Sequence, residues 1–359
     1  MRVKYILILL LPAGWLLYRL SAVDSALTER WYSGVFYKGL AGLLSTLTGW
    51  LPFSLVEVLA LLAVLFAAWW AAALIRGLWR RPAGRGAALK EAALSLLAAA
   101  GLLFFLLVGT WGLNFNRLPL ADILGLEVRP ARVAELAGLC SDLAREAGEL
   151  RDRVEEDGRG VMAPRGGYRG VFERAEAGFD LAAVNHPQFG GVRLAPKPLM
   201  LSSLVSYTGV TGVYGPLTGE ANVNVDSPSP LLAATVCHEM SHQRGFARED
   251  EANYIAYLTC GLNPDPDFQY SGKLLGLLHA MNALYRYDPR SYAEIRRGYH
   301  PGVQRDIDEI ARYSRIHQGP LERNVQSLND LYLKANNQRD GVDSYGRVVD
   351  LLLAERRVR

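Results

Sequence analysis

Long runs of apolar residues dominate the first third of the chain. Three of them, at about residues 5–22, 58–75 and 92–112, approach or exceed the roughly 20 apolar residues that cross a bilayer as a helix. Tryptophans near the ends of the later two runs suit the membrane–water interface. These are Trp69, Trp70 and Trp111. The pattern therefore predicts three N-terminal transmembrane helices, with a cleaved signal peptide as the alternative for the first run.

Basic residues are concentrated between the second and third apolar runs. The five in that connection are Arg76, Arg80, Arg81, Arg85 and Lys90. The connection between the first two runs holds only Arg30 and Lys38. By the positive-inside rule, the basic connection and the N-terminus face the cytoplasm. An odd number of spans then puts everything after Asn114 on the extracytoplasmic side.

The rest of the chain is mostly helical in pattern. Apolar residues at helical spacing predict an amphipathic helix between Pro130 and Asp157 and a short helix near 172–183. Between Val192 and Asp226, glycines and prolines separate alternating Val, Tyr and Thr, which predicts a small β-sheet with Val205–Tyr214 as a candidate peptide-binding edge strand. From Pro230 the pattern is helical almost to the end. It is broken at 262–267, around 288–301 and at 336–345.

Composition changes where the apolar runs end. We therefore expect an α+β, mostly helical chain with a membrane anchor at residues 1–113 and a water-soluble domain at residues 114–359. The net charge is +3 with both signs interspersed, so nothing indicates a nucleic-acid partner. Three cysteines without a Cys-x-x-Cys pair are too few for a disulfide scaffold. Cys237 is expected to be a small buried residue, and a Cys140–Cys260 bridge stays open.

One short motif in the predicted domain carries chemistry. His238, Glu239 and His242 form an HExxH sequence, and the apolar run at 231–236 leads into it on a half-buried helix. Residues four apart share a helix face, so both imidazoles can bind one zinc ion. Glu239 lies close enough to take a proton from a zinc-activated water, and Gly245 follows where a helix can end. The alternative is a pair of surface histidines that bind no metal.

The third metal ligand is not fixed by spacing alone. A metzincin would have its third histidine at position 248, but Arg248 stands there, and arginine does not ligate zinc. The candidates are the acids that follow, with a more distant acid as a further choice. They are Glu249, Asp250, Glu251 and, further away, Glu220.

The block from Glu249 to Asn253 resembles the ExxA(D/N) signature of gluzincin-type zinc metallopeptidases. The resemblance implies that Glu249 is the third ligand, that Ala252 permits close helix approach and that Asn253 orients a ligand histidine. Glu251 stays the alternative ligand. The chain departs from most gluzincins because only six residues separate His242 from Glu249.

A longer stretch, HEMSHQRGFAREDEANYIAYL, is similar to an uncharacterised bacterial integral-membrane family that carries this block behind three spans. The similarity covers nearly the whole chain, including residues 219–222 and 336–352, and it implies no established substrate. Together with the distribution of basic residues, it leads us to expect a zincin-like domain on the extracytoplasmic side of a bacterial cell membrane.

We therefore expect a membrane-anchored zinc metallopeptidase, with a peptide or protein substrate and membrane lipid as its partners. Two other interpretations stay open: a non-enzymatic membrane protein with a structural or sensory zinc site, and a metal-dependent amidase acting on cell-wall material. The group that polarises the substrate carbonyl is also open. Its candidates are Tyr214, Tyr254, Tyr257, Arg244 and His317. Three other histidines have no partner spacing and are not expected to be ligands: His186, His279 and His300.

Overall fold

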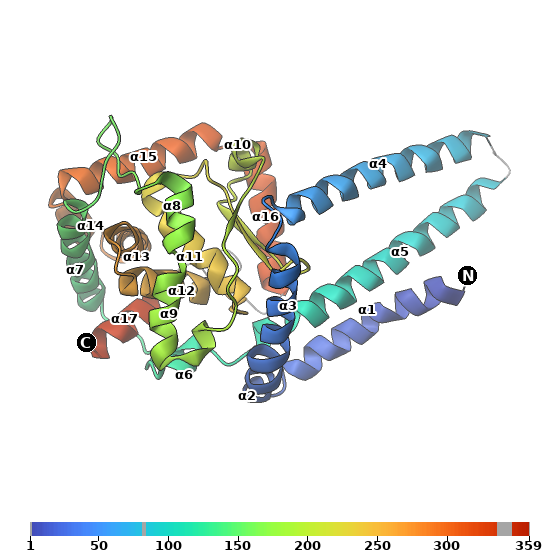
Figure 1. The fold of residues 1–359 in the computed structure, drawn as a ribbon, viewed down its shortest axis with the longest axis horizontal. Coiled ribbons are helices and arrows are strands. Elements are labelled where there is room, and N and C mark those ends of the chain that lie inside the picture. Colours follow the sequence, from blue (N-terminus) through green and yellow to red (C-terminus); the bar gives the residue numbers. More distant parts are fainter. Residues whose placement is uncertain (1, 81–83, 336–346, 359) are drawn as a thin grey trace.

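The computed structural model of the protein describes residues 2–80, 84–335 and 347–358. In these residues, three helices are long and apolar enough to cross a membrane: α1 (Arg2–Ser21), α4 (Leu55–Arg80) and α5 (Arg85–Thr110). They extend from one side of the molecule (Figure 1). The three predicted helices are thus confirmed, and the polar residues at both ends of α4 and at the start of α5 lengthen them beyond the apolar runs.

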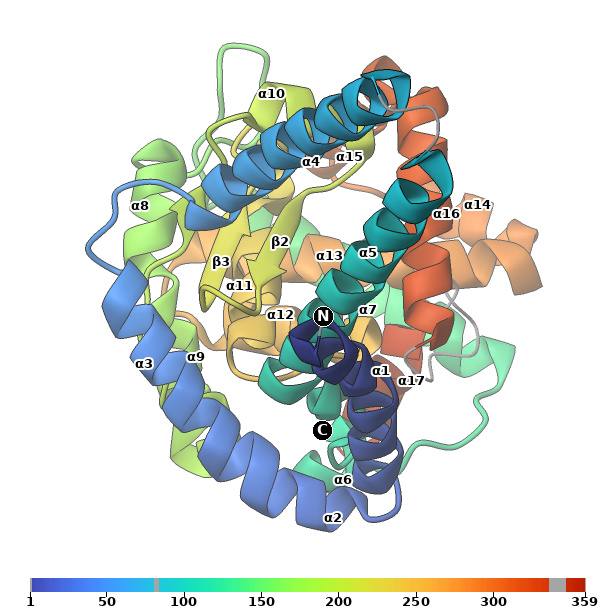
Figure 2. The same ribbon diagram turned by 90° about the vertical axis from the view of Figure 1, so that its right-hand side faces the viewer.

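The segment between α1 and α4 is also helical, which the sequence pattern does not predict. It consists of α2 (Ser25–Leu27), the π-helix η1 (Thr28–Tyr37) and α3 (Lys38–Thr48). We call residues 25–48 the helical arm. The arm runs across the ends of α1, α4 and α5 that lie nearest the rest of the protein (Figures 1 and 2).

The described residues after Thr110 form what we call the helical body. Its helices are η3 (Gly112–Asn116), α6 (Leu120–Leu124), α7 (Val133–Arg151), α8 (Gly167–Arg174), α9 (Glu176–Asn185), η4 (Pro187–Phe189), α10 (Ser202–Val205), η5 (Ser206–Thr208), η6 (Ser229–Leu231), α11 (Leu232–Gln243), α12 (Glu249–Leu262), α13 (Pro266–Tyr287), α14 (Pro289–Arg297), α15 (Pro301–His317), α16 (Pro320–Ala335) and α17 (Val348–Val358). Buried apolar faces of α7, α11, α12, α13 and α17 form one continuous core. Helix α11 is therefore buried along nearly its whole length, which is more than the half-buried helix that the sequence predicts.

A small sheet packs against α11. Its strands are β1 (Lys197–Pro198), β2 (Gly212–Gly215) and β3 (Glu220–Val223), in the order β1-β3-β2. Strand β3 pairs in parallel with β1 and antiparallel with β2, so β2 is an edge strand. The predicted mostly helical α+β fold with a small sheet is confirmed.

Two details of the predicted pattern are wrong. The strand expected over Val205–Tyr214 is helical in its first part, where α10 and η5 lie, and only its end belongs to β2. The hydroxyl of Ser206 donates to the Ser202 carbonyl at 3.0 Å, and such local bonds favour turns over strands. The single helix expected near 172–183 is divided into α8 and α9.

Other sequence expectations have mixed outcomes. The predicted break at 336–345 lies outside the described residues. The three cysteines are free and buried, so a Cys140–Cys260 bridge is not formed. The division of the chain at residue 113 stays a prediction.

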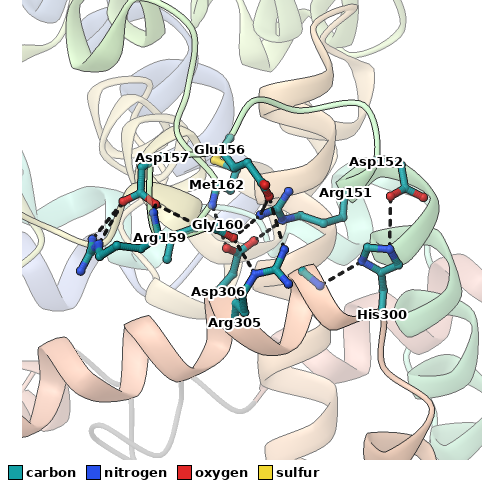
Figure 3. A network of polar contacts seen from close by, with 12 residues as sticks. Arg151, Asp152, Glu156, Asp157, Arg159, Gly160, Met162, His300, Arg305 and Asp306 are labelled. Atoms are coloured by element: carbon teal, nitrogen blue, oxygen red, sulfur yellow. Dashed lines mark hydrogen bonds and ion pairs between the residues drawn. The ribbon is translucent and has the colours of Figure 1, made fainter.

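A buried ionic network joins α7 to α15 beside the core (Figure 3). Nε of Arg151 donates to Asp306 at 2.7 Å, and both side chains are almost fully buried. The backbone N–H of Met162 donates to the other carboxylate oxygen of Asp306 at 2.8 Å. The hydroxyl of Tyr270 on α13 donates to Asp306 as well. One carboxylate therefore connects three helices and a loop.

We predict that Asp306→Ala destabilises the helical body, because it leaves the Arg151 guanidinium buried without its main acceptor. Breaking a buried ion pair costs about 3–5 kcal/mol, which corresponds to a fall in Tm of roughly 10 °C for a body of this size. Thermal unfolding of the purified protein in detergent measures the change. Asp308→Ala, on the exposed side of the same helix, is the matched control. Equal Tm values for the two variants would contradict the prediction.

Candidate metal centre

Helix α11 directs both motif histidines to the same point. The Nε2 atoms of His238 and His242 lie 3.1 Å apart. Two nitrogens that bind one tetrahedral zinc ion at about 2.0–2.1 Å are separated by roughly 3.3 Å, so this spacing suits a shared metal.

The chain reverses directly after α11. Gly245 has a φ of +85°, and a Cβ at this position would lie 2.9 Å from the ring of Tyr37. Glycine has no Cβ, so it adopts this positive φ without strain and leaves room for the Tyr37 ring. The reversal brings the first residue of α12, Glu249, back alongside α11.

Glu249 completes a cluster with the two histidines. One of its carboxylate oxygens lies 3.2 Å from Nε2 of His238, and the other lies 3.7 Å from Nε2 of His242. Ligand atoms from the three residues all lie within 4.8 Å of one another. Two imidazoles and one carboxylate fit zinc and leave a fourth position for water or substrate. The three residues therefore form a candidate metal-binding group.

The other ring nitrogen of each histidine has its own acceptor. Nδ1 of His238 lies 3.0 Å from Oδ1 of Asn253, and Nδ1 of His242 lies 2.7 Å from the Phe246 carbonyl. Such acceptors hold the proton on Nδ1 and leave the Nε2 lone pair directed at a metal. The structure thus places Asn253 against a candidate ligand histidine.

The remaining candidate acids point elsewhere. Glu251 accepts a hydrogen bond from the first backbone N–H of α6, and it lies 3.6 Å from Arg248. Asp250 also faces Arg248, at 3.7 Å. Glu220 forms an ion pair with a buried lysine at 2.6 Å. Of the four acids that the sequence left open, the structure brings Glu249 to the imidazoles.

The electrostatics of the cluster favour a positive charge. Burial opposes protonation of His242, but the carboxylates of Glu249 and Glu239 outweigh it and raise the pKa of this imidazole to about 9. Despite burial, the two imidazoles hold the pKa of Glu249 well below its usual range. A divalent cation would supply the same positive charge without protonating the rings.

Glu239, the second residue of the motif, lies beside the cluster. Burial raises the pKa of this side chain, and the described residues offer no hydrogen-bond partner to its Oε2 atom. Strand β2 crosses directly over it, since a Cβ on Gly212 would lie 2.5 Å from Oε1 of Glu239. A buried carboxylate oxygen without a partner is costly, which is typical of functional positions.

The candidate metal-binding group opens into a cleft of about 560 Å³. Its walls come from α11, β2 and the residues before it, the chain after α5, and α16. The wall includes residues that no sequence pattern connects with the motif, among them Trp111, Phe115, Val325, Gln326, Asn329 and Tyr332. No spacing relates them to the motif, because they come from segments far before and far after it.

Among the five candidates for carbonyl polarisation, Tyr214 belongs to the cleft wall. Its hydroxyl oxygen lies 2.8 Å from that of Tyr37. Arg244 is fully buried in an ion pair with Glu176, and Tyr257 accepts a hydrogen bond from Lys273. These two, Tyr254 and His317 are not among the residues that line the cleft.

Fold and site together define a predominantly helical protein with three candidate membrane helices and a candidate His-His-Glu metal centre. The chain belongs to the family described as "Protein of unknown function (DUF3810)", whose model matches residues 32–353. No curated protein and no solved structure matches it. Membership of an uncharacterised family over most of the chain is thereby confirmed, whereas the relation to gluzincins stays a prediction.

We predict that Glu249→Gln weakens zinc binding and that Glu251→Gln does not. An amide is a poor zinc ligand, and loss of a direct ligand should exceed the roughly 10- to 100-fold effect of losing an outer hydrogen bond. Glutamine at 251 keeps an oxygen for the backbone of α6. Competition of the purified variants with a chelator measures the dissociation constants. The reverse order of effects would identify Glu251 as the ligand.

Proposed function

We propose that the protein is a membrane-anchored zinc metallohydrolase that cleaves peptide bonds. The observation that carries the proposal is the buried, partnerless carboxylate oxygen of Glu239 beside three candidate ligands and an open cleft. His238, His242 and Glu249 would hold the metal. Zinc, when bound, would polarise the substrate carbonyl and acidify a water molecule.

Glu239 would act as the general base and then as the general acid. It takes a proton from the attacking water and passes it to the leaving amine as the peptide bond breaks. Burial disfavours the charged carboxylate form of Glu239 and so raises its pKa. The side chain can therefore hold the proton between its removal from water and its delivery to the amine.

The edge strand β2 would align the substrate. Its residues Gly212, Val213 and Tyr214 line the cleft, and an extended peptide can pair with an edge strand through backbone hydrogen bonds. Tyr214 at this strand is the candidate donor to the developing oxyanion. This geometry favours a peptide over a short cell-wall amide, because a strand edge recognises several consecutive residues.

A structural or sensory zinc site is the principal rival. Structural sites are usually closed by four protein ligands. The candidate group offers three and faces a cleft, which supports catalysis.

We predict that Glu239→Gln lowers peptide hydrolysis by about 100-fold or more, since a positioned general base contributes roughly 10²–10⁴-fold. Zinc content, measured by elemental analysis of the same preparation, should not change. Hydrolysis is followed with a pool of unstructured peptides by mass spectrometry, beside a pool of peptidoglycan fragments. Release from the fragments alone would favour the amidase. Zinc binding without hydrolysis of either pool would favour the structural role.

We also propose that α1, α4 and α5 span the membrane and that the helical body lies on the extracytoplasmic side. The basic residues at the end of α4 and the beginning of α5 support this orientation through the positive-inside rule.

The orientation predicts a difference in thiol labelling. An impermeant maleimide should label Tyr287→Cys in intact spheroplasts, and Gly86→Cys only after the membrane is opened. Both positions are exposed, and the native cysteines are buried and should contribute little signal. The opposite labelling pattern would show that the body faces the cytoplasm.

A further inference from the structure

The helical arm has its polar and apolar faces reversed relative to an ordinary surface helix. The side that packs on the protein carries buried hydroxyls, and the outward side carries large apolar residues, each more than half exposed. The buried hydroxyl residues are Thr28, Ser33, Ser45 and Thr48. The outward apolar residues are Leu27, Trp31, Val35, Leu43 and Leu47.

Three of the four buried hydroxyls of the arm have hydrogen-bond partners inside the protein. The hydroxyl of Thr28 donates to the Ser21 carbonyl at 2.8 Å, and that of Ser33 donates to Oδ1 of Asn114 at 2.9 Å. Near the other end, Thr48 donates to the carbonyl of Thr218 at 3.1 Å. Water on the outer side would make this arrangement unfavourable, whereas lipid would favour it. The outward face of the arm is therefore suited to the bilayer.

The metal cleft is attached to the ends of two candidate membrane helices. Trp111, the first residue after α5, has its ring 4.9 Å from the Tyr214 ring and 6.0 Å from the His242 ring, centroid to centroid. The next residue of β2, Gly215, packs against Val56 in the first turn of α4. Strand β2 thus contacts the beginning of α4 and the residue that follows α5. Because β2 also lines the cleft, the candidate metal centre lies close to these ends of the two helices.

Helix α4 also holds the segment that precedes β2. The carboxylate of Glu57 accepts hydrogen bonds from the backbone N–H groups of Met200 at 2.6 Å and Leu201 at 3.0 Å. The side chains of Met200, Leu201 and Leu204 are more than half exposed beside this attachment. The apolar surface therefore continues from α4 onto the cleft side of the body.

Figure 2 views the molecule from the side of the three long helices. Strands β2 and β3 are visible between α4 and α5, with the arm on one side and α16 on the other. Helix α16 contributes Val325, Asn329 and Tyr332 to the cleft, while its Leu328 and Leu331 are more than half exposed. Apolar residues thus surround the cleft on the side from which the membrane helices leave.

We propose that the substrate is a membrane-anchored protein, cleaved in the segment that leaves the bilayer next to its own transmembrane helix. This inference rests on the proposed peptidase function and names the substrate class of that site. An extended chain advances only about 3.3 Å per residue, so a cleft at the membrane surface reaches bonds within a few residues of the bilayer. A freely soluble peptide lacks the anchor that keeps it at this depth.

The first experiment uses the full chain in phosphatidylcholine–phosphatidylglycerol vesicles with three pools of peptides. All pools share the same randomised segment. In the first pool the segment continues directly into an apolar helix of about 20 residues. In the second, a long Gly/Ser linker separates the segment from the same helix, and in the third there is no helix. Mass spectrometry follows cleavage, with the Glu239→Gln protein as the blank.

We expect the directly anchored pool to be cleaved at least about tenfold faster than the linker pool, because co-localisation in the vesicle is equal for both and only distance from the bilayer differs. Equal cleavage of these two pools would overturn the proposed substrate class and leave the peptidase function intact. Faster cleavage of the soluble pool would do the same. Absence of cleavage in all three pools would overturn both proposals.

A second experiment tests the position of the arm without any hydrolysis. Leu43→Cys and Leu47→Cys carry a fluorophore that spin-labelled lipids quench, and Tyr287→Cys on the far side of the body is the matched control. All three positions are more than half exposed. We expect strong quenching at both arm positions and little at the control. Quenching at the arm no greater than at the control would overturn the proposed membrane-surface position of the cleft.

Discussion

The candidate metal centre depends on the tight reversal of the chain at Gly245. Within it the carbonyl of Phe246 turns toward Nδ1 of His242, at 2.7 Å, and fixes the orientation of that ring. The same reversal returns Glu249 to the histidines after only six residues. The short spacing that separates this chain from most gluzincins is therefore compatible with a three-ligand cluster, because no additional element has to be accommodated between the two helices.

Contacts with the arm and with the chain after α5 hold this reversal in place. Arg117 forms a two-pronged ion pair with Glu29 of the arm, with both N–O distances at 2.8 Å, and it donates to the Gly245 carbonyl at 2.8 Å. Its guanidinium also lies 3.8 Å from the centre of the Phe246 ring. Because Arg117 is almost fully buried, these contacts are little screened by solvent. The arm and the metal-binding turn consequently behave as one structural unit.

Sequence periodicity could predict the elements whose buried faces repeat regularly. It found the three long helices, α7 and the helix that carries the motif, but it missed the arm, because a helix with an apolar outer face does not follow the soluble pattern. It could not choose between Glu249 and Glu251. These residues stand roughly 200° apart around a helix, so the choice depends on how α12 packs on α11. The cleft residues Trp111 and Tyr332 come from distant segments, and only tertiary structure brings them to the site.

The acids near the motif show how packing decides the role of a residue type. Glu220 lies in a strand next to the cleft, yet its oxygens meet Lys197 and the first backbone N–H groups of α4, at Leu55 and Val56. A carboxylate at the N-terminus of a helix is stabilised by the helix dipole and by those unpaired N–H groups. Glu220 therefore joins the sheet to α4, and its oxygens are engaged away from the candidate metal-binding group. Glu251 also has one buried oxygen without a hydrogen-bond partner, so such an oxygen does not by itself distinguish a candidate base. Glu239 differs because it lines the cleft beside both histidines, whereas Glu251 does not line the cleft.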